Sequence, residues 1–186
     1  MIAGFDPGLG HTGYALIRRD RALVAAGVSV TAKGPKGARE DVQRRMEEHG
    51  RTLIPIIRRA SDVVVVEWPT GAGFAKRGAV CPACGQSRGN SAAAATTMAI
   101  AGGVQWAAWM AGRPVWAPAP ITWRTKLGYR RGRDDQDGDL DEKIHAAMLA
   151  RYGEQLAALK ISRRYLPHVL EAIAMARARL EWTATD

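Results

Sequence analysis

Apolar residues are arranged in short runs over the first third of the chain and at helical spacing afterwards. The runs at residues 1–6, 12–17 and 23–31 are separated by turns rich in glycine or charge, and they predict three strands joined as a meander. Residues 38–60 have apolar side chains at near-helical spacing and predict a helix, with Pro55 kinking it or marking its last turns.

The second part of the chain begins with four consecutive valines at residues 63–66. A run without a polar face predicts a central parallel strand that is covered on both sides. Further along, the pattern predicts a buried alanine-rich helix, a short strand and two final helices, at residues 91–111, 115–117, 140–152 and 166–182. This order predicts an α/β fold in which helices pack on a mixed sheet.

The length of 186 residues favours one domain over residues 1–186, and we find no internal repeat. Residues 68–90, rich in glycine, cations and cysteine, are expected to form an exposed loop. Residues 129–139 are expected to form a charged linker within the domain, because five cations between residues 124 and 133 are followed by six acids between residues 134 and 142.

The chain is strongly basic. It has 27 lysines and arginines against 18 acids, a net charge of +9, and 21 of the cations are arginine. The planar guanidinium group binds phosphate oxygens in pairs, so this composition favours a nucleic-acid partner. Composition leaves one alternative open. A genome whose codon usage favours arginine would give the same charge, which would then serve only solubility.

Several classes of protein are disfavoured by composition. No apolar stretch approaches the length of a membrane span and no signal peptide is evident, so we expect neither membrane insertion nor secretion. The two cysteines, Cys81 and Cys84, form one CxxC unit, which provides no disulfide framework and fits a reducing cytoplasm. One CxxC supplies half of a zinc site, which a dimer could complete, but two free thiols are the simpler interpretation.

Four side chains are candidates for chemistry. Asp6 and Glu67 each end an apolar strand, and His168 and Glu171 share one face of the last predicted helix. If the two strands are neighbours and that helix crosses their ends, the four groups converge. Oxygen and nitrogen donors of this kind suit Mg²⁺ or Mn²⁺, and two such ions can hydrolyse a phosphodiester. Taken singly, each residue also fits a structural role, such as capping a turn or forming an ion pair.

Two stretches resemble a known family. Residues 2–14, IAGFDPGLGHTGY, and residues 170–176, LEAIAMA, are similar to the opening strand and the closing helix of the RuvC family of Holliday junction resolvases. The valine strand ending in Glu67 and the alanine-rich helix follow in the family's order. The resemblance covers most of the chain.

The resemblance implies a ribonuclease H-like fold with a mixed five-stranded sheet, made of the three-stranded meander plus parallel strands and flanked by helices. It also implies a homodimeric, metal-dependent endonuclease that resolves four-way junctions or related branched DNA with two Mg²⁺ or Mn²⁺ ions per site. The family's acids fall on Asp6, Glu67, His168 and Glu171. The last two depart from the usual aspartates, and Glu171 is one methylene longer. The compact chain and its unusual loop favour a phage-encoded type.

Other residues are expected to contact DNA. The resemblance places Lys143 beside the scissile phosphate, although an exposed helix lysine is the equal alternative. Trp68 and Phe74 could stack on an unpaired base, while Trp68 fits a core position equally well. The candidate phosphate contacts are the cations of the loop, the linker and the last helices: Lys76, Arg77, Arg88, Arg124, Lys126, Arg130, Arg131, Arg133, Arg163 and Arg164.

Three other functions compete with this hypothesis. One is a junction-binding protein whose chemistry was lost through His168 and Glu171, and a second is a nuclease of the same fold that acts on RNA. A phosphotransferase of the actin-like class is disfavoured, because such enzymes need two ribonuclease H-like domains. The residues do not indicate the range of branched substrates, a cleavage-sequence preference or a helicase partner.

Overall fold

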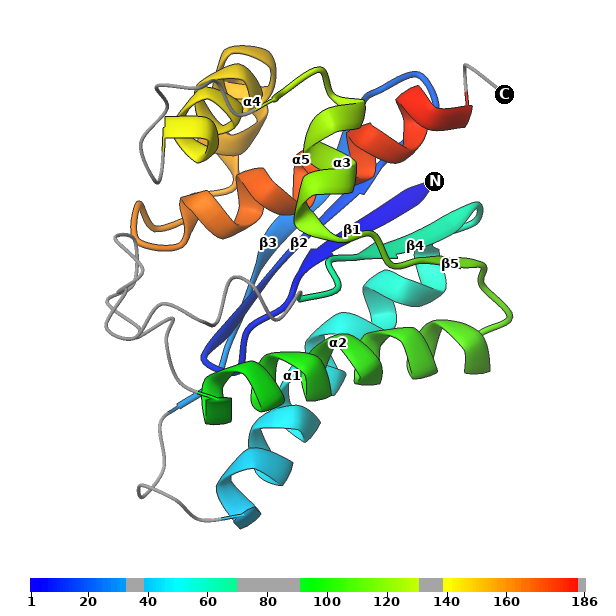
Figure 1. Cartoon of the computed structure of the whole chain (residues 1–186), viewed down its shortest axis with the longest axis vertical. Coiled ribbons are helices and arrows are strands. Elements are labelled where there is room, and N and C mark those ends of the chain that lie inside the picture. Colours follow the sequence, from blue (N-terminus) through cyan, green and yellow to red (C-terminus); the bar gives the residue numbers. More distant parts are fainter. Residues whose placement is uncertain (33–38, 70–90, 131–138, 184–186) are drawn as a thin grey trace.

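The structure is a computed structural model that describes residues 1–32, 39–69, 91–130 and 139–183 (Figure 1). These residues form five strands and five helices. In chain order they are β1 (Ile2–Asp6), β2 (His11–Ile17), β3 (Leu23–Val30), α1 (Arg39–Arg59), β4 (Val63–Val66), α2 (Ser91–Met110), β5 (Val115–Trp116), α3 (Pro120–Lys126), α4 (Asp139–Ala158) and α5 (Leu166–Thr183). Within this part of the chain, no helix has the length and apolar character needed to cross a membrane.

The strands form one mixed sheet in the order β3-β2-β1-β4-β5. The pairs β3–β2 and β2–β1 are antiparallel, whereas β1–β4 and β4–β5 are parallel. The predicted five-stranded sheet, with a meander and added parallel strands, is therefore confirmed.

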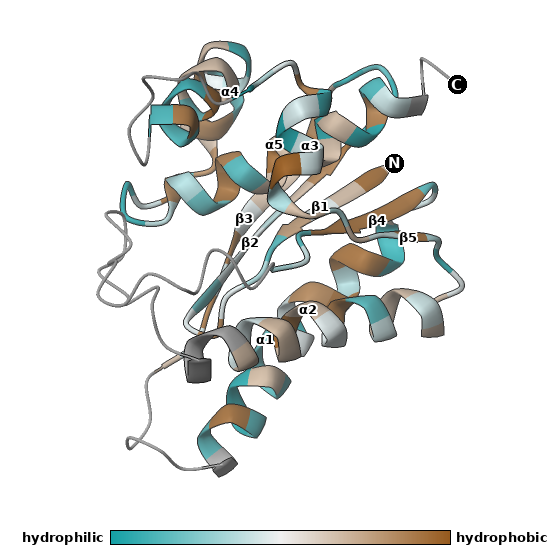
Figure 2. Cartoon of the chain, viewed as in Figure 1, coloured by the Kyte–Doolittle hydropathy of each residue, from teal (hydrophilic) through white to brown (hydrophobic). Residues whose placement is uncertain are grey.

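Helices cover both faces of the sheet, with α3, α4 and α5 on one side and α1 and α2 on the other (Figure 1). Side chains alternate between the faces along each strand, so Val63 and Val65 pack towards α5 while Val64 and Val66 pack towards α1 and α2. Strands β1 and β4 at the centre of the sheet are correspondingly apolar over most of their length (Figure 2). Continued by one residue past β4, the same alternation directs Glu67 towards α5.

Two glycines allow α5 to lie directly on the sheet. A Cβ atom on Gly4 would lie 2.1 Å from the carbonyl oxygen of Ala172, and one on Gly13 would lie 2.2 Å from that of His168. Gly13 is also the cross-strand partner of Asp6. The close approach at Gly13 therefore places His168 beside the strand end that bears Asp6.

Helix α3 was not predicted from the sequence. It begins at Pro120, which fills the first helical position and fixes the backbone angle that a helix start needs. Its Trp123 is fully buried against α5. Helix α4 also continues to Ala158, beyond the predicted end at residue 152.

The expectation that the helix at residues 91–111 is buried was wrong for one of its faces. One face of α2 packs on the sheet through Ala101, Val104 and Ala108. The opposite face is exposed, with Trp106 and Trp109 at 63% and 64%. The pattern of a helix without charges indicates an apolar surface, but it does not show what covers that surface.

Candidate metal-binding site

The structure brings the four predicted residues to one edge of the sheet. Asp6 ends β1, Glu67 follows β4, and His168 and Glu171 lie in the first turns of α5. The Nδ1 atom of His168 lies 2.6 Å from Oδ2 of Asp6, so the imidazole N–H donates to the carboxylate. Both side chains are largely buried, at 15% and 12% exposure.

Glu67 is held by a residue that the sequence did not indicate. The indole Nε1–H of Trp123 donates to Oε2 of Glu67 at 2.9 Å. Burial, followed by the negative charges of Glu171 and Asp6, raises the pKa of Glu67 to about 8. Three carboxyl groups thus repel one another at a partly desolvated place.

The donor set fits a divalent cation. Among the described residues, no lysine or arginine forms an ion pair with Asp6, Glu67 or Glu171. Asp6 and Glu171 contact histidines instead, and Glu67 accepts from Trp123, with Arg124 acting on its charge from beyond ion-pair distance. A bound divalent ion would supply the positive charge that these carboxylates lack, and oxygen donors suit Mg²⁺ or Mn²⁺. In the described ranges, no three histidine, cysteine or acidic side chains are already close enough together to hold one ion.

Two further histidines face this group. His11, at the start of β2, is 6% exposed, and its ring centroid lies 4.2 Å from that of His168. Burial, followed by the neighbouring charge of His168, lowers the pKa of His11 to about 4, so its imidazole is neutral at pH 7. His145, on α4, has its Nε2 atom 3.4 Å from Oε1 of Glu171.

A buried polar network fixes the turn that follows Asp6. The Nε2–H of His49 donates to the carbonyl oxygen of Leu9 at 3.0 Å, which leaves Nδ1 to accept the hydroxyl proton of Ser29 at 2.8 Å. The hydroxyl group of Thr31 also donates to Leu9 O, at 2.7 Å, and itself accepts from Arg45 Nε at 2.9 Å. Helix α1 thus holds the turn between Asp6 and His11 in place.

Comparison with solved structures places this site in a known fold. The chain matches Thermus thermophilus RuvC in complex with a Holliday junction substrate over 99% of its own length and 94% of that chain, with 19% identity and a TM-score of 0.65. A second Thermus thermophilus RuvC structure matches at 20% identity and a TM-score of 0.62, covering 99% and 95%. The fold is that of RuvC. No family model and no curated protein matches the chain.

Two residues that were predicted to contact DNA, Lys143 and Trp68, are both exposed. Lys143 is exposed near the beginning of α4. Trp68 is 39% exposed, and its backbone N–H donates to Pro118 O at 2.9 Å, so Trp68 does not belong to the buried core.

The cations that were predicted to bind phosphate, and that the structure describes, lie in different surroundings. Arg163 and Arg164 are exposed just before α5, beside Tyr165, whose ring centroid lies 5.6 Å from that of His11. Arg124 instead forms an ion pair with Asp141 at 2.8 Å. Lys126 lies over the ring of Trp182, which is about 21 Å along α5 from His168. Arg130 is exposed after α3.

The remaining predicted residues lie outside the described part of the chain. They are the loop residues Phe74, Lys76, Arg77, Cys81, Cys84 and Arg88, and the linker residues Arg131 and Arg133. Their roles stay predictions. The exposed loop expected at residues 68–90 and the charged linker expected at residues 129–139 also stay predictions, because most of their residues lie outside the described ranges.

Four members of this region were not predicted from the sequence: Trp123, His11, His49 and His145. Each has an ordinary place in its local pattern. Only Pro120 gave a usable signal, because a proline after Pro118 and Ala119 is well suited to begin the helix that bears Trp123.

Proposed function

We propose that the protein is a divalent-metal-dependent endonuclease that cleaves branched DNA, four-way junctions foremost, by phosphodiester hydrolysis. The observation that supports it most is the group of Asp6, Glu67 and Glu171, gathered at one sheet edge without a lysine or arginine partner among the described residues. The RuvC-like fold adds support, since the matched Thermus thermophilus RuvC is a complex with a Holliday junction substrate.

Asp6, Glu67, His168 and Glu171 would hold two Mg²⁺ or Mn²⁺ ions. When bound, such ions activate a water molecule and stabilise the leaving oxygen of a phosphodiester. The chain's own residues prepare this centre. Trp123 fixes one oxygen of Glu67, His168 orients the carboxylate of Asp6, and the α1 network holds the turn after Asp6.

Cations around this edge would bind the phosphate backbone. Arg163 and Arg164 are exposed just before α5, and the charge of Arg164 is near enough to His11 to contribute to its lowered pKa. Lys143 would offset charge at the scissile phosphate. Trp68, half-exposed directly after Glu67, would stack on an unpaired base at the centre of the junction.

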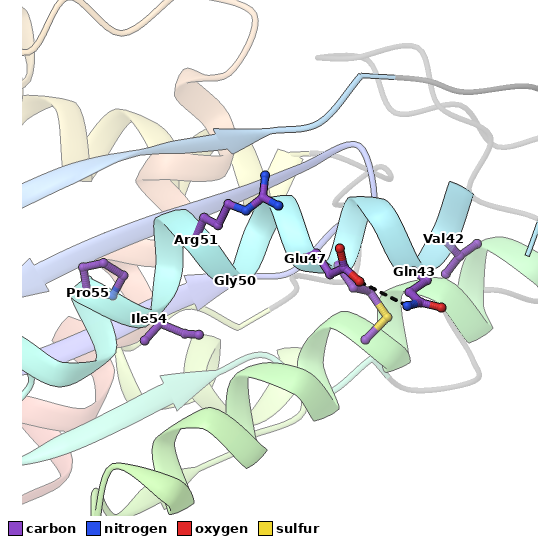
Figure 3. A pocket seen from close by; sticks show the side chains of 8 residues that line it. Val42, Gln43, Glu47, Gly50, Arg51, Ile54 and Pro55 are labelled. Carbon is purple, nitrogen blue, oxygen red and sulfur yellow. Dashed lines mark hydrogen bonds between the residues drawn. The ribbon is translucent and has the colours of Figure 1, made fainter. Parts of the chain in front are cut away.

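We further propose that the enzyme is a homodimer, because two symmetry-related strands require two sites. Helix α2 has no charged residue among its 20 and exposes Trp106 and Trp109, whose rings lie 5.0 Å apart. Exposed tryptophans are typical of interface cores. Beside α2, helix α1 lines an apolar groove with Val42, Met46, Gly50, Ile54 and Pro55 (Figure 3). A second copy would cover this surface.

We propose that the protein is a phage-encoded resolvase that acts on DNA in the bacterial cytoplasm. In that reducing environment, Cys81 and Cys84 would remain thiols, or two copies would share one zinc ion through them.

The proposal is tested with end-labelled four-way, flap and linear DNA, and a matched RNA, incubated with the protein in Mg²⁺ or Mn²⁺. We expect paired, symmetric nicks near the crossover of the four-way junction. Asp6→Asn and Glu67→Gln should each lower cleavage by about 1000-fold or more while junction binding persists, because each removes a charge that holds metal. Asp62→Asn, at the other end of β4, is the control and should cleave like the wild type.

Three results would contradict the proposal. A gel shift of the junction in both metals without cutting would identify a binding protein. Cleavage of RNA in preference to branched DNA would identify a different nuclease. Undiminished nicking by Asp6→Asn would refute the assignment of the site.

A further inference from the structure

The proposed function assigns no role to one histidine of this region, His145. All four histidines of the chain contribute to this edge of the sheet or to the turn beneath it. His168 donates to Asp6, His11 packs against His168 with its ring tilted, and His49 holds the turn. His145 comes from α4, which bears none of the four predicted metal ligands.

The imidazole of His145 is directed at a carboxylate without forming a hydrogen bond to it. Its Nε2 atom lies 3.4 Å from Oε1 of Glu171, and the two side chains are only 20% and 16% exposed. That Nε2 atom is inaccessible to solvent and has no hydrogen-bond partner among the described residues. A buried nitrogen without a partner is costly unless something else occupies the place beside it.

The separation suits two donors of one metal ion. Donors on adjacent corners of an octahedral ion, each about 2.1 Å from it, are about 3 Å apart. Mg²⁺ and similar ions keep several of their waters and need only one or two protein ligands. A pair of side chains is therefore sufficient, even though no three donor groups of the described residues already converge on one point.

The opposite side of the site is built in the same way. Asp6 and His168 form one carboxylate–imidazole pair at 2.6 Å, and Glu171 and His145 form another at 3.4 Å. His168 and Glu171 are one helical turn apart on α5, so the two pairs are neighbours.

From this arrangement we propose that His145 is a further metal ligand, which binds the same divalent ion as Glu171. The inference rests on the proposed function, because it needs the metal that the proposed function places here. Two imidazoles in the donor set favour Mn²⁺ over Mg²⁺, since nitrogen ligands suit the transition metal better.

The test is pulsed electron paramagnetic resonance of the full chain loaded with Mn²⁺, which detects ¹⁴N nuclei bonded to the ion. The wild type should show ¹⁴N modulation. His168→Gln should retain it through His145, and the double variant His168→Gln/His145→Gln should lose it. Glu154→Gln, an exposed position further along α4, is the matched control and should match the wild type.

A second readout separates ligation from mere orientation of Glu171. His145→Gln should weaken Mn²⁺ binding by about tenfold or more, and Mg²⁺ binding less, in calorimetric titrations of variants whose thermal unfolding confirms that they are folded. Equal weakening for both metals would indicate an orienting role and would overturn the proposal.

The remaining outcomes are distinguishable from one another. Complete loss of ¹⁴N modulation in His168→Gln, or its persistence in the double variant, would overturn the assignment of His145 while leaving the metal centre intact. Failure of the wild type to bind Mn²⁺ at all would refute the metal centre of the proposed function, and this inference with it.

Discussion

Two acids flank the same short strand, β4 (Val63–Val66), and their surroundings are opposite. Asp62, before the strand, accepts from Arg19 Nε at 2.7 Å and lies 3.2 Å from the N-terminal amino group. Among the described residues, Glu67, after the strand, accepts only from the Trp123 indole. Two other carboxylates face it, and Arg124 acts on its charge without forming an ion pair. The Arg19 hydrogen bond is the main cause that lowers the pKa of Asp62 to about 2, whereas burial and like charges raise that of Glu67 to about 8.

The difference shows at which end of the sheet the chain itself provides the counter-charge for its carboxylate. At Asp62 the chain provides the counter-charge, so the carboxylate stabilises the fold as it stands. At Glu67 the chain provides an N–H donor and additional negative charge, an arrangement that a cation from outside would relieve. We interpret the first end as structural and the second as functional.

Of the two acids, Glu67 should have the larger effect. We expect it as a pH dependence of the free energy of unfolding in the absence of divalent metal. The pKa of Glu67 is raised in the folded state, so the folded chain binds the more protons between about pH 4.5 and 8 and the free energy of unfolding falls as the pH rises through that range. Glu67→Gln should remove this fall and make the protein more stable than the wild type at pH 8. Chemical denaturation in a chelator at several pH values measures it; an unchanged slope in Glu67→Gln would contradict the assignment.

Asp62 should show the reverse sign and a smaller effect. Its pKa is lowered in the folded state, so its contribution is present above about pH 4 and is lost as the pH falls towards 2. Because Arg19 is 79% exposed, Asp62→Asn should cost only about 0.2–1 kcal/mol at pH 7. The same denaturation series measures this loss, and a gain in stability at pH 7 would remove the contrast between the two ends.

Much of the fold and the core of the candidate site followed from sequence patterns. Asp6 and Glu67 each end an apolar run, so the sequence predicted that they lie at strand ends, and the spacing of His168 and Glu171 put both on one helix face. The valine run correctly indicated a strand covered on both faces.

What the sequence could not provide depends on packing between distant elements. The contact of His145 with Glu171 requires the crossing of α4 over α5, and that of Trp123 with Glu67 requires a helix only seven residues long. Neither contact leaves a periodic signal. The exposure of one face of α2 has a related reason, because hydropathy describes an apolar surface and not the partner that covers it.

The most direct test of the contrast is a carbon NMR titration of the glutamate and aspartate carboxyl groups, in the full chain, with and without Mg²⁺. Without metal, Glu67 should titrate near pH 8 and Asp62 near pH 2. With saturating Mg²⁺, the pKa of Glu67 should fall well below neutrality while that of Asp62 stays unchanged. A Glu67 carboxyl that titrates like an ordinary glutamate, or that does not respond to Mg²⁺, would contradict the assignment of this sheet edge as a metal centre.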